Sequence, residues 1–283
     1  MELTDTQQVE QVIDRALAED LGRGDVTTEA LVPDDQQGKA SITAKAKGII
    51  AGTEVARQVF LKVDPQLKVD ILVKDGGEVN PGDVIAKIEG KWASMLKAER
   101  VALNFLQHLS GIASETARYV EAVKGLPAQI TDTRKTTPGL RALEKYAVQA
   151  GGGKNHRMHL GDGILIKDNH LAALRSQGLT MKEIIAKARQ KAPAKVRIEV
   201  EVKTPQEASE AAEAGVDIIM LDNMDLQDMR QAVRLIKGRA LVEASGGITL
   251  HEVRAVAETG VDLISVGALT HSPKALDMSL QLH

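Results

Sequence analysis

Hydrophobic and polar positions follow two different periods along the chain, and the changes of period divide it into parts. Residues 9–20 repeat apolar positions with helical spacing before Gly22, which predicts an amphipathic first helix. Residues 38–90 change to the period of two that is typical of strands, with one helical segment at residues 55–63. A long helical pattern then covers residues 95–123. This order predicts a small first α+β domain that is followed by a long helix.

The last third of the chain alternates short apolar strands with amphipathic helices. The segment AEAGVDIIMLD, which begins at Ala212, returns as AETGVDLISVG at Ala257. Such strand-plus-helix repeats predict a parallel α/β barrel or open sheet, whose right-handed crossovers place the carboxyl ends of all strands on one face. Earlier strands are expected to end at residues 133–135 and at Lys167. The strands predicted in the repeat region cover residues 196–202, 217–221, 240–243 and 262–266.

Composition narrows the class of protein. With 283 residues and 43% hydrophobic content, the chain can bury a large core in one or two domains. It has no apolar run long enough to span a bilayer and no signal-peptide pattern, so we expect a soluble protein of the cytoplasm and no membrane partner. The absence of cysteine excludes disulfides and thiolate metal sites. A net charge of −3 and 2% aromatic residues argue against nucleic-acid binding.

Residues 132–170 nevertheless gather cations, mostly at predicted turns. Arginine and lysine recognise carboxylate and phosphate, and the glycine run 151–153 would let the backbone approach a ligand closely. Arg141 and Lys145 have helical spacing and are interpreted as surface residues. Because the chain as a whole is acidic, a local cluster of this kind suits a small polyanion better than a polymer. The cluster consists of Arg134, Lys135, Lys154, His156, Arg157 and Lys167.

Acids and glycines follow the predicted strands. Glu201, Asp222 and Glu243 stand at the ends of three strands, and the carboxylates of Glu201 and Asp222 could hold ribose hydroxyls or Mg²⁺. The alternative is that these acids simply pair with nearby arginines. Glycine-containing loops after the last two strands of a barrel commonly bind phosphate. The chain shows no Ser/His/Asp arrangement, so the residues favour catalysis by positioning and electrostatics. The two loops contain Ser245-Gly246-Gly247 and Gly267-Ala268.

Several segments together resemble one known family, from about Leu17 to Ser272. They include DTRKTTPGLR, GGGKNHR, IKDNH, EASGGI and VGALTHS, in this order, and the chain is similar here to quinolinate phosphoribosyltransferase. The resemblance implies an α/β protein with an N-terminal α/β sandwich at residues 1–112 and an incomplete, TIM-like parallel barrel at residues 113–283. It leaves open that the last helix packs back on the first domain. It also implies a homodimer in which Arg100 enters the partner's site.

The resemblance further implies a reaction and a role for each site residue. Phosphoribosyl pyrophosphate and quinolinate would give nicotinate mononucleotide, pyrophosphate and CO2, with Mg²⁺ as cofactor, in NAD biosynthesis. Glu201 and Asp222 would contact the ribose and its metal, and with Lys135 and Lys167 they would be catalytic. The quinolinate and phosphate pocket would be lined by Thr133, Arg134, Lys135, His156, Arg157 and Lys167. The 5′-phosphate would be held by Ser245, Gly246, Gly247, Gly267 and Ala268.

Three other functions remain open on the residues alone. A barrel isomerase or aldolase would act on a phosphorylated sugar without a pyridine substrate. A nicotinate phosphoribosyltransferase would use a monocarboxylate and need fewer cations. The hairpins of the first domain also suggest a non-catalytic carrier with a modified lysine near Lys87. His108, on the long helix, is interpreted as a satisfied core or interface histidine.

Overall fold

The computed structural model describes residues 6–193 and 195–283, which fold into two compact units. The first unit combines Met1–Ala117, Thr136–Gly152 and Ala268–His283. The second combines Arg118–Lys135 and Gly153–Gly267. The predicted ranges 1–112 and 113–283 are each continuous, whereas these units interleave along the chain. Within the described residues, no helix is long and apolar enough to cross a membrane.

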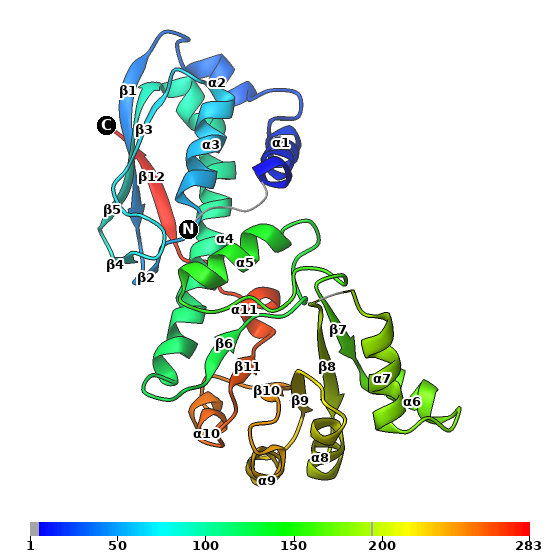
Figure 1. Ribbon diagram of the computed structural model, residues 1–283. Coiled ribbons are helices and arrows are strands. Elements are labelled where there is room, and N and C mark those ends of the chain that lie inside the picture. The colour runs from blue at the N-terminus through cyan, green and yellow to red at the C-terminus, as the bar shows by residue number, and fades with distance from the viewer. Residues whose placement is uncertain (1–5, 194) are drawn as a thin grey trace. The chain divides into compact units, whose positions relative to one another are not determined.

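A four-stranded antiparallel sheet, with helices on one side of it, forms the first unit (Figure 1). Its strand order is β12-β1-β5-β3, and a separate small ladder pairs β2 with β4. The strands are β1 (Gln37–Ala44), β2 (Gly48–Ile49), β3 (Lys68–Ile71), β4 (Glu78–Val79), β5 (Val84–Lys91) and β12 (Met278–Leu282). The helices are α1 (Thr6–Leu21), α2 (Val26–Leu31), α3 (Thr53–Val63), α4 (Trp92–Ala122), α5 (Arg141–Ala150) and α11 (Ala268–His271). The last residues of α4, from Arg118 on, belong to the second unit.

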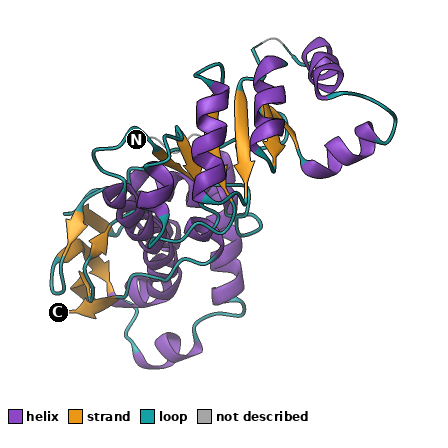
Figure 2. Cartoon of the chain, turned by 90° about the horizontal axis from the view of Figure 1, so that it is seen from below, coloured by secondary structure: helices purple, strands orange, loops and turns teal. Residues whose placement is uncertain are grey.

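Six parallel strands form the second unit, and helices flank them (Figures 1 and 2). The order β6-β11-β10-β9-β8-β7 does not close into an eight-stranded barrel, so the predicted α/β class with an incomplete barrel is confirmed. The strands are β6 (Gln129–Thr131), β7 (Gly163–Ile166), β8 (Arg197–Val202), β9 (Ile218–Asp222), β10 (Leu241–Ser245) and β11 (Leu263–Ser265). The helices are α6 (Asp168–Arg175), α7 (Met181–Lys191), α8 (Pro205–Glu213), α9 (Leu226–Ile236) and α10 (Val253–Ala257).

The repeated GVD segment has a structural role at the amino ends of the strands. Asp217 accepts the backbone N–H of Ile198 at 2.7 Å, and Asp262 accepts that of Val242 at 2.8 Å. Each aspartate thus satisfies a backbone donor on the neighbouring strand, which would otherwise be left without a partner at the sheet end. Past these residues β9 is buried almost throughout, as expected for a parallel strand that is covered on both faces.

Two glycines of the first unit are required by close packing. A Cβ on Gly38 would lie 1.6 Å from Nε1 of Trp92, so the indole packs directly against the backbone of β1. A Cβ on Gly151 would lie 2.3 Å from the carbonyl oxygen of Ala113 in α4. The glycine run was interpreted as giving a ligand access to the backbone, but its first member serves the packing of α5 on α4.

Two other sequence interpretations differ from the structure. Lys145 was interpreted as a surface residue, but it is fully buried. The helix expected before the last strand of the repeat region is reduced to the five residues of α10. The last helix, α11, belongs to the first unit, and so does the strand β12, which pairs with β1. His108 does find a partner, because its Nε2 lies 2.9 Å from the buried carboxylate of Glu144.

Candidate functional site

A cavity of about 390 Å³ opens at the carboxyl ends of the parallel strands in the second unit. Parallel strands place their carboxyl ends on one face, and loops of different strands therefore meet there. Most of the side chains predicted for a site are among those that line it. The lining consists of Thr133, Arg134, Lys135, His156, Arg157, Leu165, Lys167, Glu201, Met220, Asp222, Glu243, Ser245 and Ser265.

The cations of the cavity come from three separate segments. Arg134 and Lys135 follow β6, and Lys167 follows β7 directly as the residue before α6. Arg157 lies in the loop between α5 and β7. In the same loop, Lys154 forms an isolated parallel bridge to Thr131 of β6. Lys154 belongs to the predicted cluster but does not line the cavity.

The guanidinium groups of Arg134 and Arg157 are close enough to repel one another electrostatically. Burial lowers the pKa of Arg157 first, and the positive charge of Arg134 lowers it further. Nη1 of Arg157 donates to the carbonyl oxygen of Gly163 at 3.1 Å. Nε of Arg134 is buried and has no hydrogen-bond partner among the described residues. Two mutually repelling cations with unused donors are typical of a site that binds a polyanion.

Carboxylates occupy the neighbouring strand ends. Burial raises the pKa of Glu201, and the negative charges of Asp222 and Asp168 raise it further. Asp168 is paired with Lys203 at 2.9 Å, and Asp222 accepts a hydrogen bond from Asn223 at 3.0 Å. Within residues 6–193 and 195–283, neither Glu201 nor Asp222 forms an ion pair with an arginine, so the alternative of simple ion pairs gains no support. Hard oxygen donors that repel one another fit a divalent cation such as Mg²⁺.

The turn after β10 requires glycine at position 246. Gly246 has a φ of 110°, and a Cβ there would lie 2.3 Å from Oδ1 of Asn223. Gly247 also has a positive φ, and Ser245 pairs with Asp222 across the sheet. Ser245 lines the cavity, whereas Gly246, Gly247 and Gly267 do not. The phosphate-binding role of this turn therefore stays a prediction.

Two predicted site residues belong to the first unit. Arg100 is exposed on α4, and Ala268 begins the short helix α11. Neither lines the cavity of the second unit. Their predicted contributions, Arg100 to a partner's site and Ala268 to the 5′-phosphate, are consequently untested.

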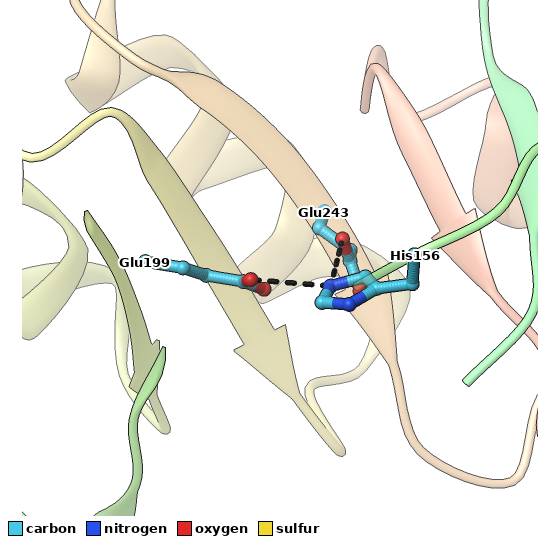
Figure 3. Close-up of side chains that lie close together, drawn as sticks. All are labelled: His156, Glu199 and Glu243. Atoms are coloured by element: carbon cyan, nitrogen blue, oxygen red, sulfur yellow. Dashed lines mark ion pairs between the residues drawn. The ribbon is translucent and has the colours of Figure 1, made fainter. Parts of the chain in front are cut away.

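The structure adds three acids that the sequence interpretation did not assign to the site. Glu199 and Glu243 lie 3.1 and 3.5 Å from Nε2 of His156, and the side chains are 6% and 0% exposed (Figure 3). Asp132, fully buried, accepts the backbone N–H of His156 at 2.8 Å. The sequence did contain a signal for Glu199. Residues two apart on a strand point to the same face, and Glu201 was already assigned to the site, so Glu199 could have been expected on the same face. Glu243 was noted at a strand end without a role.

The three side chains in Figure 3 form one ion-paired cluster. Burial lowers the pKa of His156, but its contacts with the carboxylates of Glu199 and Glu243 outweigh this effect and raise the pKa to about 10. Burial also raises the pKa of Glu199. The backbone N–H of Arg157 donates to Nδ1 of His156 at 2.9 Å, and only an unprotonated nitrogen can accept it. With Nδ1 as the acceptor, Nε2 carries the ring N–H and faces the two carboxylates.

Comparison with known proteins gives the family of the chain. Residues 25–110 match the N-terminal domain of quinolinate phosphoribosyl transferase, and residues 112–281 match its C-terminal domain. A probable nicotinate-nucleotide pyrophosphorylase (carboxylating) of Bacillus subtilis is 45% identical, over 97% of this chain and 93% of the relative. A quinolinate phosphoribosyltransferase (decarboxylating) of Nicotiana glauca is 43% identical, over 98% and 83%. The crystal structure of NadC from Streptococcus pyogenes superposes with a TM-score of 0.93 at 46% identity, covering 99% of both chains. The chain belongs to the quinolinate phosphoribosyltransferase family.

Proposed function

We infer that this chain transfers the phosphoribosyl group of phosphoribosyl pyrophosphate to the ring nitrogen of quinolinate. The products are nicotinate mononucleotide, pyrophosphate and CO2, and the reaction serves NAD biosynthesis. Family membership supports the reaction. The observation that carries the proposal is the single cavity in which Arg134, Arg157 and Lys167 face the carboxylates of Glu201 and Asp222. Two polyanionic substrates and a sugar that develops positive charge need this combination.

Quinolinate is a planar dianion with adjacent carboxylates, and the cations account for its recognition. Arg134 and Arg157 offer flat guanidinium forks, which bind carboxylates with two parallel hydrogen bonds. Lys135 and Lys167 add point charges, and Thr133 and His156 complete the wall. Because the two arginines repel one another before the ligand arrives, the dianion relieves that repulsion when it binds.

Glu201 and Asp222 are proposed to hold the ribose and Mg²⁺. Burial, and after it the negative charges of Asp222 and Asp168, raise the pKa of Glu201, and this excess of negative charge supports a cation at this place. When bound, Mg²⁺ would neutralise the leaving pyrophosphate. The two carboxylates stabilise positive charge on the sugar as pyrophosphate departs. The backbone after β10 and at Gly267 and Ala268 is proposed to hold the 5′-phosphate through N–H groups, beside Ser245 and the turn Gly246-Gly247.

The same cations support the decarboxylation. Attack by the pyridine nitrogen forms the new N–C bond and gives a pyridinium ring. Loss of CO2 from position 2 leaves an electron pair that the positive ring stabilises, and a proton then replaces the carboxylate. Arginine and lysine side chains hold the remaining carboxylate in place during both steps.

The reaction is tested with quinolinate that is labelled in its 2-carboxylate. Release of labelled CO2 is expected only when phosphoribosyl pyrophosphate and Mg²⁺ are both present. Nicotinate serves as the comparison substrate, because a nicotinate phosphoribosyltransferase would convert it without loss of CO2. Failure to release label, or a preference for nicotinate, would overturn the proposal. Borohydride trapping of a sugar phosphate on a lysine would instead favour an aldolase.

We also propose a homodimer in which Arg100 completes the partner's site. Arg100 is exposed on α4, so its guanidinium is available to another chain. Arg100→Ala and Arg134→Ala variants should each lose most activity. A mixed dimer would contain one intact site, so mixing the two inactive variants should restore up to about a quarter of the wild-type activity. If mixing restores no activity, or the wild type migrates as a monomer, Arg100 does not act across an interface.

A further inference from the structure

His156 is held by the protein at three atoms. Its backbone N–H donates to Asp132 at 2.8 Å, its Nε2 faces Glu199 at 3.1 Å, and its Nδ1 accepts the N–H of Arg157 at 2.9 Å. Both ring nitrogens therefore point to protein groups (Figure 3 shows the Nε2 side). A histidine that binds a substrate carboxylate would need one of its N–H groups for that purpose.

The two glutamates that contact Nε2 of His156 are costly for folding. Glu243 is fully buried, and neither of its oxygens has a hydrogen-bond partner among the described residues. One oxygen of Glu199 is also without such a partner. Burying carboxylates with incomplete hydrogen bonding destabilises a fold. They come from two different strands, β8 and β10, and converge on one imidazole nitrogen, which indicates a functional reason for keeping them.

The imidazole ring of His156 restrains the next residue, Arg157. The Nδ1 contact fixes the backbone amide of Arg157, and the bond from Nη1 to Gly163 fixes the guanidinium at its other end. A backbone amide that is fixed in this way restricts where the side chain begins, so the remaining guanidinium donors have a defined direction. Arg157 lines the cavity from a loop and not from a helix or strand, so its direction depends on contacts of this kind.

We propose that His156, whose Nε2 contacts Glu199 and Glu243, is a positioning residue. It orients Arg157 toward the dianionic substrate and does not itself bind that substrate. This inference rests on the proposed function. It makes the two buried glutamates part of substrate recognition, although neither needs to touch quinolinate.

A double-mutant cycle separates positioning from direct binding. Quinolinate affinity is measured by calorimetry for the wild type, His156→Ala, Arg157→Gln and the double variant. Loss of His156 should weaken binding about tenfold in the wild-type background and less than about twofold when Arg157 is already replaced. A histidine that binds the substrate directly would give equal losses in both backgrounds, and that result overturns the proposal. If the wild type does not bind quinolinate at all, the proposed function itself fails.

Isosteric variants keep the test independent of misfolding. Glu243→Gln preserves shape and should raise the KM for quinolinate several-fold while leaving the KM for phosphoribosyl pyrophosphate within about twofold. His156→Asn places an amide oxygen near the Nδ1 position and should retain more quinolinate affinity than His156→Gln. An equal rise in both KM values would indicate general disruption and contradict the inference. His159→Ala is the matched control, because His159 is in the same loop but is exposed and paired with Asp162.

Discussion

Replacing Arg134 by lysine tests the recognition of quinolinate most directly. The substitution keeps the positive charge in the cavity but removes the planar fork and the buried Nε–H, which has no hydrogen-bond partner among the described residues. A lysine can keep one charged hydrogen bond where the guanidinium makes two. Because a hydrogen bond to a charged group contributes about 1.5–3 kcal/mol, the Kd for quinolinate should rise roughly ten- to hundredfold.

Calorimetric titration without phosphoribosyl pyrophosphate isolates this binding step. The affinity for nicotinate, which has one carboxylate, should change less than that for quinolinate. Arg254→Lys is the control, because Arg254 lies on α10, outside the cavity, and bonds to the carbonyl oxygen of Ala122. If Arg134→Lys binds quinolinate within about twofold of the wild type and is equally stable in urea, the fork does not recognise the dianion.

Three further changes test the metal site and the packing. Asp222→Asn should raise the KM for phosphoribosyl pyrophosphate at least about tenfold and leave the Kd of quinolinate nearly unchanged, since a neutral amide binds Mg²⁺ weakly; equal effects on both would contradict the assignment. Gly38→Ala should lower the free energy of unfolding by about 1–3 kcal/mol, because the added Cβ would overlap the indole of Trp92. Urea unfolding measures this change. Glu144→Ala should cost about 1–3 kcal/mol, since the fully buried carboxylate accepts the N–H of Thr137 at 3.0 Å; an unchanged urea midpoint would refute it.

Periodicity predicted most of the fold because parallel strands and amphipathic helices leave strong local signals. The four strands of the repeat region and the long helix α4 were expected within a few residues of their bounds. The strand β12 was not expected, because its partner β1 lies at the other end of the sequence and pairing between distant segments leaves no local pattern. Lys145 was misjudged for a similar reason, since helical spacing does not reveal which face of α5 is covered.

The sequence predicted those parts of the candidate site whose positions follow from the order and direction of the strands. Strand ends of a parallel sheet share one face, so Arg134, Lys167 and Asp222 could be expected in one cavity from their positions alone. The side-chain contacts of the residues around the cavity could not be predicted from the sequence, because they depend on the direction of individual side chains. Thus His156 was assigned to the wall, while its engagement with Glu199 became visible only in three dimensions.

The pairing of β12 with β1 affects how the chain can be synthesised and divided. Register pairs run from Ala40 with Leu282 to Ala44 with Met278, so the edge of β1 is completed by a strand that leaves the ribosome long after β1 itself. Until then the nascent first sheet exposes unpaired backbone groups that other chains can bind. A fragment cut after α4 should therefore aggregate, and adding a peptide of residues 276–283 in trans should improve its yield.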